Sequence, residues 1–187
     1  MSSHDHALEH QHHQLESDST DVFGFWLFIL TDCILFGTLF ATYVVLHRSW
    51  SFPAFKPHID LVYVLGETVF LLLSNFCFGL AILSLYKKNV NWARIFLIIT
   101  FILGAAFVAM ELYEFYKLAV MEHYDWTISG SASAFFILVG THGLHVTIGL
   151  IWILIMTVQL SMYGITTVTK RRLTYLGLFW NFLDIVW

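Results

Sequence analysis

The fold is decided by residues 131–160, which read SASAFFILVGTHGLHVTIGLIWILIMTVQL. This run contains no Lys, Arg, Asp or Glu, and it is longer than the roughly 20 apolar residues that a helix needs to cross a bilayer core. His142 and His145 lie in its middle, where polar side chains are costly and tend to face the interior of a helix bundle. The run therefore predicts a membrane-spanning helix whose histidines make contacts inside the protein.

The rest of the chain repeats this pattern. It is 58% hydrophobic and 12% charged, whereas a soluble domain has roughly 25% charged residues. Further spans are predicted at about 24–46, 61–85, 93–112 and 173–187. The last covers about 22 Å of helix against a core of about 30 Å, so we expect the natural protein to continue beyond Trp187. The predicted class is an all-α polytopic transmembrane bundle of five helices over residues 22–187, the last helix truncated.

Residues 1–21 form a separate, polar segment that contains five histidines and no Lys or Arg. A secretory signal would begin with a basic region, so this segment is not one. It lacks Cys and regular metal-ligand spacing. We expect a disordered cytoplasmic tail rather than a metal site.

The basic residues predict the orientation. Six of the nine Lys and Arg residues fall in two loops on one side of the membrane, namely Lys87, Lys88, Arg94, Lys170, Arg171 and Arg172. By the positive-inside rule this side faces the cytoplasm, which places the N-terminus inside. The basic residues form no single patch, which argues against a nucleic-acid partner.

Two groups of polar residues are candidates for a site within the spans. Glu67 lies in the second span at a depth that overlaps the depth of His142 and His145 in the fourth, when helix tilt is allowed. We therefore expect a buried hydrogen bond between Glu67 and His142.

The other group consists of Asp32 in the first span and Asp184, with Asn181 one turn before it, in the fifth. Interhelical hydrogen bonds that hold the bundle in register are their predicted role. Glu111 and Glu114 are expected to be solvated at the membrane interface.

Three interpretations of the two histidines compete. A haem with two histidine ligands is disfavoured, because His142 and His145 share one helix face and no other predicted span supplies a histidine. A proton relay or transporter site could combine them with Glu67 and Asp184. The favoured interpretation is polar packing in a subunit that associates with other chains, and we expect no cofactor or metal in this chain.

Five segments together resemble a known family. They are residues 23–43 (FGFWLFILTDCILFGTLFATY), Glu67-Thr68, residues 110–115 (MELYEF), residues 133–146 (SAFFILVGTHGLHV) and residues 180–187 (WNFLDIVW). In order and spacing they resemble subunit III of haem-copper terminal oxidases, and the five-helix form is similar to the bacterial quinol oxidase branch, the cytochrome bo3 ubiquinol oxidase type.

The resemblance implies a subunit III that carries no redox cofactor, in the inner membrane of a bacterium. Its implied partners are the catalytic subunit I, which holds the haems and copper, subunit II, a small subunit IV and bound phospholipid. The complex would oxidise quinol with dioxygen and pump protons.

The family's polar residues map onto Glu67, His142, His145 and Asp184, while Asn181 stands where the family commonly has histidine. Two other functions stay open: an accessory protein of a nitric oxide reductase, and a stand-alone proton-coupled carrier.

Overall fold

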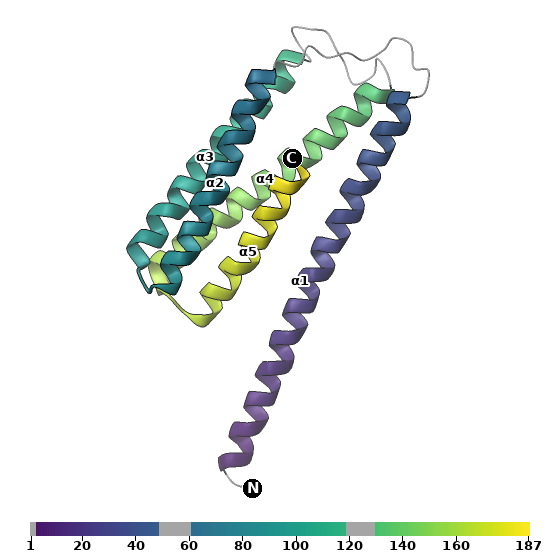
Figure 1. The fold of residues 1–187 in the computed structure, drawn as a ribbon. Helices are drawn as coiled ribbons and strands as arrows, with labels where there is room; N and C mark the ends of the chain where they lie inside the picture. The colour runs from purple at the N-terminus through teal and green to yellow at the C-terminus, as the bar shows by residue number, and fades with distance from the viewer. Residues whose placement is uncertain (1–2, 49–60, 119–129) are drawn as a thin grey trace. The chain divides into compact units, whose positions relative to one another are not determined.

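The computed structural model describes residues 3–48, 61–118 and 130–187. Its regular elements are the α-helices α1 (Ser3–Arg48), α2 (Leu61–Tyr86), α3 (Val90–Tyr116), α4 (Gly130–Tyr163) and α5 (Thr167–Val186) (Figure 1). The predicted all-α class is confirmed.

Four of the helices are long and apolar enough to cross a membrane. These segments are Val22–His47, Leu61–Tyr86, Val90–Tyr116 and Gly130–Met162. The fifth helix, α5, has 20 residues and begins at Thr167, six residues before the predicted start of the last span. Its first turns carry Lys170, Arg171 and Arg172, which lower its mean hydropathy.

The chain divides into two compact units, residues 1–37 and residues 38–187. The first unit is the N-terminal part of α1, which includes the histidine-rich segment that the sequence predicts to be disordered. The second unit contains α2 to α5 together with the last residues of α1, and it holds the candidate site.

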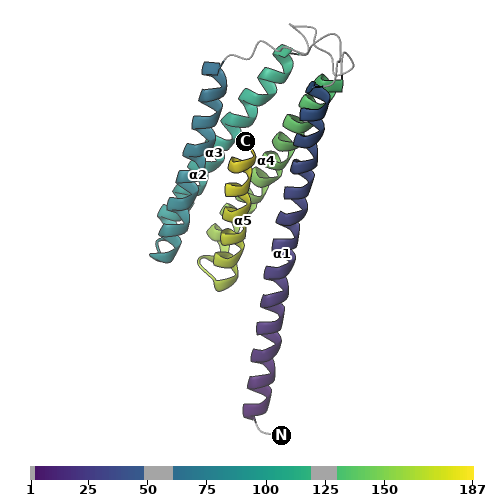
Figure 2. The same ribbon diagram turned by 45° about the vertical axis from the view of Figure 1, so that its right-hand side comes forward.

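Within the second unit, α2 to α5 form a closed ring, since α2 packs against α3 and α5, and α4 also packs against α3 and α5. Figures 1 and 2 both show α2 and α3 side by side. Each presents a buried stripe at alternating spacings of four and three residues: 67, 71, 74, 78, 81, 85 on α2 and 93, 97, 100, 104, 107, 111 on α3. This spacing keeps one face of each helix toward its neighbour.

Two hydrogen bonds fix the register of α2 against α3. The Ser74 hydroxyl donates to the carbonyl oxygen of Thr100 over 3.1 Å. Near the N-terminus of α2, the Tyr63 hydroxyl donates to the carbonyl oxygen of Met110 over 3.0 Å. Both bonds join helices inside an apolar bundle, where such polar contacts set register.

The short connections between helices contain residues that explain where α4 ends and where α5 begins. Gly164 follows α4 with a φ of 68°, a left-handed conformation that glycine adopts without cost. The Thr166 hydroxyl then accepts a hydrogen bond from the backbone N–H of Thr169 over 3.1 Å and caps α5. Between α2 and α3, Lys88 has a φ of 59°.

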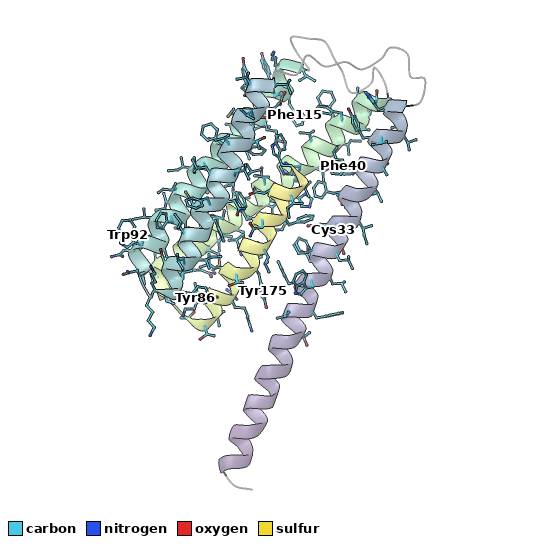
Figure 3. All side chains as sticks on the ribbon, viewed as in Figure 1. Cys33, Phe40, Tyr86, Trp92, Phe115 and Tyr175 are labelled. Atoms are coloured by element: carbon cyan, nitrogen blue, oxygen red, sulfur yellow. The ribbon has the colours of Figure 1, made fainter. Side chains whose placement is uncertain are left out.

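Aromatic side chains flank the connection between α2 and α3. Tyr86 ends α2, Trp92 lies in the first turn of α3, and both are exposed (Figure 3). Tyr86 directly precedes Lys87 and Lys88, and Trp92 follows them by four residues. Tyr and Trp are enriched at membrane interfaces, so this end of the α2–α3 pair has the composition of an interface.

Candidate functional site

The His142 side chain is held by contacts with α5. It is 3% exposed, and its Nε2 lies 3.2 Å from the carbonyl oxygen of Leu183. A carbonyl can only accept, so Nε2 carries the proton and donates. The imidazole also lies 5.2 Å from the Trp187 ring and 5.9 Å from the Phe107 ring, measured between centroids. His142 thereby joins α3, α4 and the end of the chain.

Trp187 extends this contact to α2. Its indole Nε1 donates to the Thr68 hydroxyl over 3.1 Å, and its ring meets Phe107 edge-on at 4.9 Å. Side chains from α2, α3 and α4, with Trp187 directly after α5, therefore meet at one level of the bundle. We call the set Glu67, Thr68, Glu111, His142, Gly143, Asp184 and Trp187 the polar layer.

The predicted hydrogen bond between Glu67 and His142 is wrong. Glu67 is 0% exposed, and neither carboxyl oxygen has a hydrogen-bond partner in the part of the chain that the structure describes. The physical reason is the direction of His142, whose Nε2 turns to the Leu183 carbonyl of α5. Depth along a helix predicts height in the membrane but not the side toward which a side chain points.

The expected solvation of Glu111 is also wrong. Glu111 is 3% exposed, and its carboxyl packs on Gly143 of α4: a Cβ atom there would lie 2.7 Å from Oε2 and 2.9 Å from Oε1. Glu114, one turn further, is half-buried. The signal that could have found Glu111 is its spacing, because it continues the buried stripe of Thr100, Gly104 and Phe107.

The polar residues of α5 contact α2. The Asn75 amide donates to the Asn181 side-chain oxygen over 2.6 Å, and the same amide lies close to the carboxyl of Asp184. The hydrogen bond between α2 and α5 is made by Asn181 as the acceptor, and the hydrogen bond predicted for Asp184 itself stays a prediction.

His145 and Asp32 lie outside the polar layer. The Nδ1 of His145 donates to the carbonyl oxygen of Thr141 in its own helix over 2.7 Å, and its ring lies 6.5 Å from that of Phe179. Asp32 lies on α1 in the first unit. Among the described residues, no group of three or more His, Cys, Asp or Glu side chains could hold a metal ion.

Trp180 is a structural residue that sequence reasoning missed. It is 0% exposed, and its ring lies in a slot between two glycines. A Cβ at Gly149 would be 2.8 Å from the ring, and a Cβ at Gly104 would be 3.1 Å from it. Close approach of helices at glycine is a common packing device in membranes, and here it brings α3 and α4 against α5.

The model of the family described as cytochrome c oxidase subunit III matches residues 4–187, nearly the whole chain. The chain belongs to this family.

Several similar proteins come from bacteria. A protein of Pseudomonas putida named "Cytochrome bo(3) ubiquinol oxidase subunit 3" is 49% identical over 173 residues, which cover 92% of this chain and 83% of the relative. A protein of Pseudomonas aeruginosa with the same name is 46% identical over 97% of this chain and 88% of its own length. The "Probable quinol oxidase subunit 3" of Staphylococcus saprophyticus is 39% identical over 88% of this chain and 82% of its own length.

Proposed function

We propose that this chain is subunit III of a membrane-bound ubiquinol oxidase, a complex that oxidises quinol with dioxygen and translocates protons. In it the chain is a non-redox subunit. It packs on the side of the catalytic subunit, which carries the haems and copper, and stabilises it. Membership of the subunit III family and the names of the bacterial relatives support the assignment.

The observation that carries the non-redox role is the use of the two membrane histidines. The Nε2 of His142 donates to the Leu183 carbonyl, and the Nδ1 of His145 donates to the Thr141 carbonyl. A haem iron bound by histidine takes a ring nitrogen as its ligand. We propose that both histidines serve packing, His142 between α4 and α5 and His145 within α4.

The proposal extends to the topology. We propose that α5 forms the fifth span, with the basic residues Lys170 to Arg172 of its first turns in the headgroup region and its apolar part from Leu173 onward in the bilayer core. We propose that the N-terminus lies in the cytoplasm of a bacterial cell and that the spans lie in its inner membrane; the orientation is supported by the positive-inside rule, because most of the basic residues fall at the α2–α3 and α4–α5 connections.

The proposed partners are the catalytic subunit I, subunit II, a small subunit IV and phospholipid. A mostly apolar pocket in the second unit supports a lipid site, because Phe40, Leu138, Val139, Val186 and Trp187 line it with His142 at its polar end. Acyl chains suit such a lining.

Purification of a tagged chain from its native membrane in mild detergent tests the assignment. We expect a larger haem-containing partner to copurify, together with quinol-dependent oxygen consumption that copper- and haem-binding inhibitors such as cyanide block. If the purified complex consumes nitric oxide instead, the chain is an accessory protein of a nitric oxide reductase. If no redox protein copurifies, the subunit role is contradicted, and the stand-alone proton-coupled carrier becomes the remaining interpretation.

A further inference from the structure

Asn75 and Asn181 lie near the middle of the proposed bilayer core, and neither is buried within this chain. Asn75 is near the middle of α2 (Leu61–Tyr86) and is half-buried, whereas Asn181 is exposed. Asn181 follows Leu173, where the apolar part of α5 begins, by eight residues, which is about 12 Å of helix. A bilayer core is about 30 Å thick, so the hydrogen bond that joins the two amides lies close to its middle.

The hydrogen bonds within the chain leave the amide nitrogen of Asn181 unused. The Asn75 amide nitrogen donates to the Asn181 side-chain oxygen over 2.6 Å and lies close to the Asp184 carboxyl. The Asn181 oxygen is therefore the acceptor, and its NH2 group carries two further donors. These two donors reach no acceptor in the part of the chain that the structure describes.

Lipid cannot satisfy these N–H groups at this depth. Acyl chains contain no hydrogen-bond acceptor, and a polar group that is removed from water without a hydrogen bond is costly. Polar side chains within membranes accordingly face protein or a water-filled cavity, and hydrogen bonds between helices satisfy them. The surface around Asn181 is therefore unsuited to acyl chains and suited to protein.

The outward surfaces of α3 and α4 differ from this surface at the same depth. The large exposed side chains near the middle of these two helices are apolar, namely Ile98, Ile99, Ile102, Leu144, Ile148 and Ile151. Thr147 is exposed as well, but its hydroxyl donates to the Gly143 carbonyl of its own helix over 2.8 Å. Among the described residues of α2 to α5, only the α2–α5 surface presents an unpaired amide NH2 group at mid-depth.

The backbone of α2 is open to a neighbouring helix on the same surface. Gly79 follows Asn75 by one turn, and a Cβ atom there would meet nothing within 4 Å. Leu72 precedes Asn75 by three residues and is 56% exposed. Residues at these spacings share one face of a helix, and glycine lets membrane helices approach closely. We call Leu72, Asn75 and Gly79 of α2 together with Asn181 of α5 the amide face.

We propose that the amide face is the contact surface for a transmembrane helix of a partner subunit, which presents a hydrogen-bond acceptor to the NH2 group of Asn181. The acceptor is a hydroxyl, amide or carboxyl oxygen on that helix. Leu72 supplies apolar packing beside it, and Gly79 permits the close approach of the two backbones. The inference rests on the proposed function, because it takes the chain to be a subunit, and it names the surface on which a neighbouring subunit lies.

Photo-cross-linking of the full chain in its native membrane tests the proposal. p-Benzoylphenylalanine, which bonds to neighbouring C–H groups when irradiated, replaces Leu72 in one variant and Ile102 of α3 in the control. Both positions are apolar, lie in the middle part of a helix and are 56% and 60% exposed. We expect the Leu72 variant to bond to a membrane-spanning peptide of another subunit, identified by mass spectrometry, and the control to bond to lipid.

Three outcomes of this experiment would overturn the proposal. The Leu72 variant could bond to lipid alone, it could bond to a second copy of this chain, or both variants could bond equally to another subunit. None of them depends on the loss of the Asn75–Asn181 bond, because both amides are unchanged in the two variants.

A second measurement separates the outward hydrogen bond from the one inside the chain. Asn75→Ala and Asn181→Ala both remove the bond between the two amides, but only Asn181→Ala also removes the donors to the partner. We expect Asn181→Ala to weaken retention of the chain in the purified complex about threefold more than Asn75→Ala, the ratio that an average hydrogen bond between membrane helices gives. Equal retention of the two variants, or weaker retention of Asn75→Ala, would contradict an acceptor on the partner.

Failure of the inference is distinct from failure of the proposed function. If a haem-containing partner copurifies while the Leu72 variant bonds to lipid alone, the subunit role stands and the proposal for the amide face is wrong. If no redox protein copurifies, the proposed function fails, and a protein adduct of the Leu72 variant would still show that a membrane protein lies on the amide face.

Discussion

At the scale of single residues, Trp180 shows how closely the helices of this bundle approach. The indole is 0% exposed, and Gly104 and Gly149 leave the space that it fills. A rigid ring cannot yield as a flexible side chain can, so a methyl group added on either glycine must displace a helix. The size of the Trp180 side chain therefore sets how closely α3, α4 and α5 pack together.

We predict that Gly149→Ala lowers the free energy of unfolding of this chain by about 1–3 kcal/mol, the usual cost of overpacking a core. Denaturant titration in detergent micelles measures the change. Gly79→Ala is the matched control, because a Cβ at Gly79 meets nothing within 4 Å. Adding Trp180→Phe to Gly149→Ala should recover part of the lost stability. Equal stability of Gly149→Ala and Gly79→Ala would contradict the claim that Trp180 packs tightly between the two glycines.

A second residue-scale prediction concerns the bond between Asn75 and Asn181. Over 2.6 Å it joins α2 to α5, and hydrogen bonds of this kind in membrane bundles average about 0.6 kcal/mol. A double-mutant cycle with Asn75→Ala and Asn181→Ala should show a coupling of about that size. Strictly additive effects of the two substitutions would mean that the bond contributes nothing.

At the scale of helices, apolar runs made the spans predictable, and local chemistry set their ends. The second span is predicted at 61–85, and α2 is Leu61–Tyr86. Among α2 to α5, the start of α5 differs most from the prediction, since hydropathy places it after the basic residues Lys170 to Arg172. The structure begins α5 at Thr167, because the Thr166 hydroxyl caps its first turn. Hydropathy reports where a helix is apolar, and capping determines where it begins.

The polar layer was predictable only in part, for a geometric reason. The presence of Glu67 and His142 within apolar runs marked both as buried, and both are. Their partners depend on the rotation of each helix about its axis, which depth does not provide. The spacing of the buried residues of α3, which include Phe107 and Glu111, indicates which face of that helix is buried. In the structure Glu111 packs from this face against Gly143.

One prediction at this scale uses the same substitution at two glycines. Gly164 has a φ of 68° after α4, where alanine costs roughly 1–2 kcal/mol. Gly79 lies inside α2 with open space at its Cβ position, where alanine gains about 0.5–1 kcal/mol. Gly164→Ala should therefore lower the thermal stability of the chain and Gly79→Ala should raise it. Changes in melting temperature of the same sign for both variants would contradict the left-handed conformation of Gly164.

At the scale of the whole molecule, the outward surface is suited to lipid and to other subunits. On α4 the side chains of Leu144, Ile148, Ile151 and Ile155 are exposed. An apolar surface of this extent is a site for a membrane or a protein partner. The polar contacts of His142 and Trp187, by comparison, join different elements of the bundle.

The most direct test of the non-redox role is a reduced-minus-oxidised haem spectrum of the purified complex before and after this chain is stripped from it. We predict that all the haem stays with the larger partner and that the initial rate of quinol oxidation is retained. Haem that leaves with this chain would contradict the account, because the chain would then hold a redox cofactor of its own.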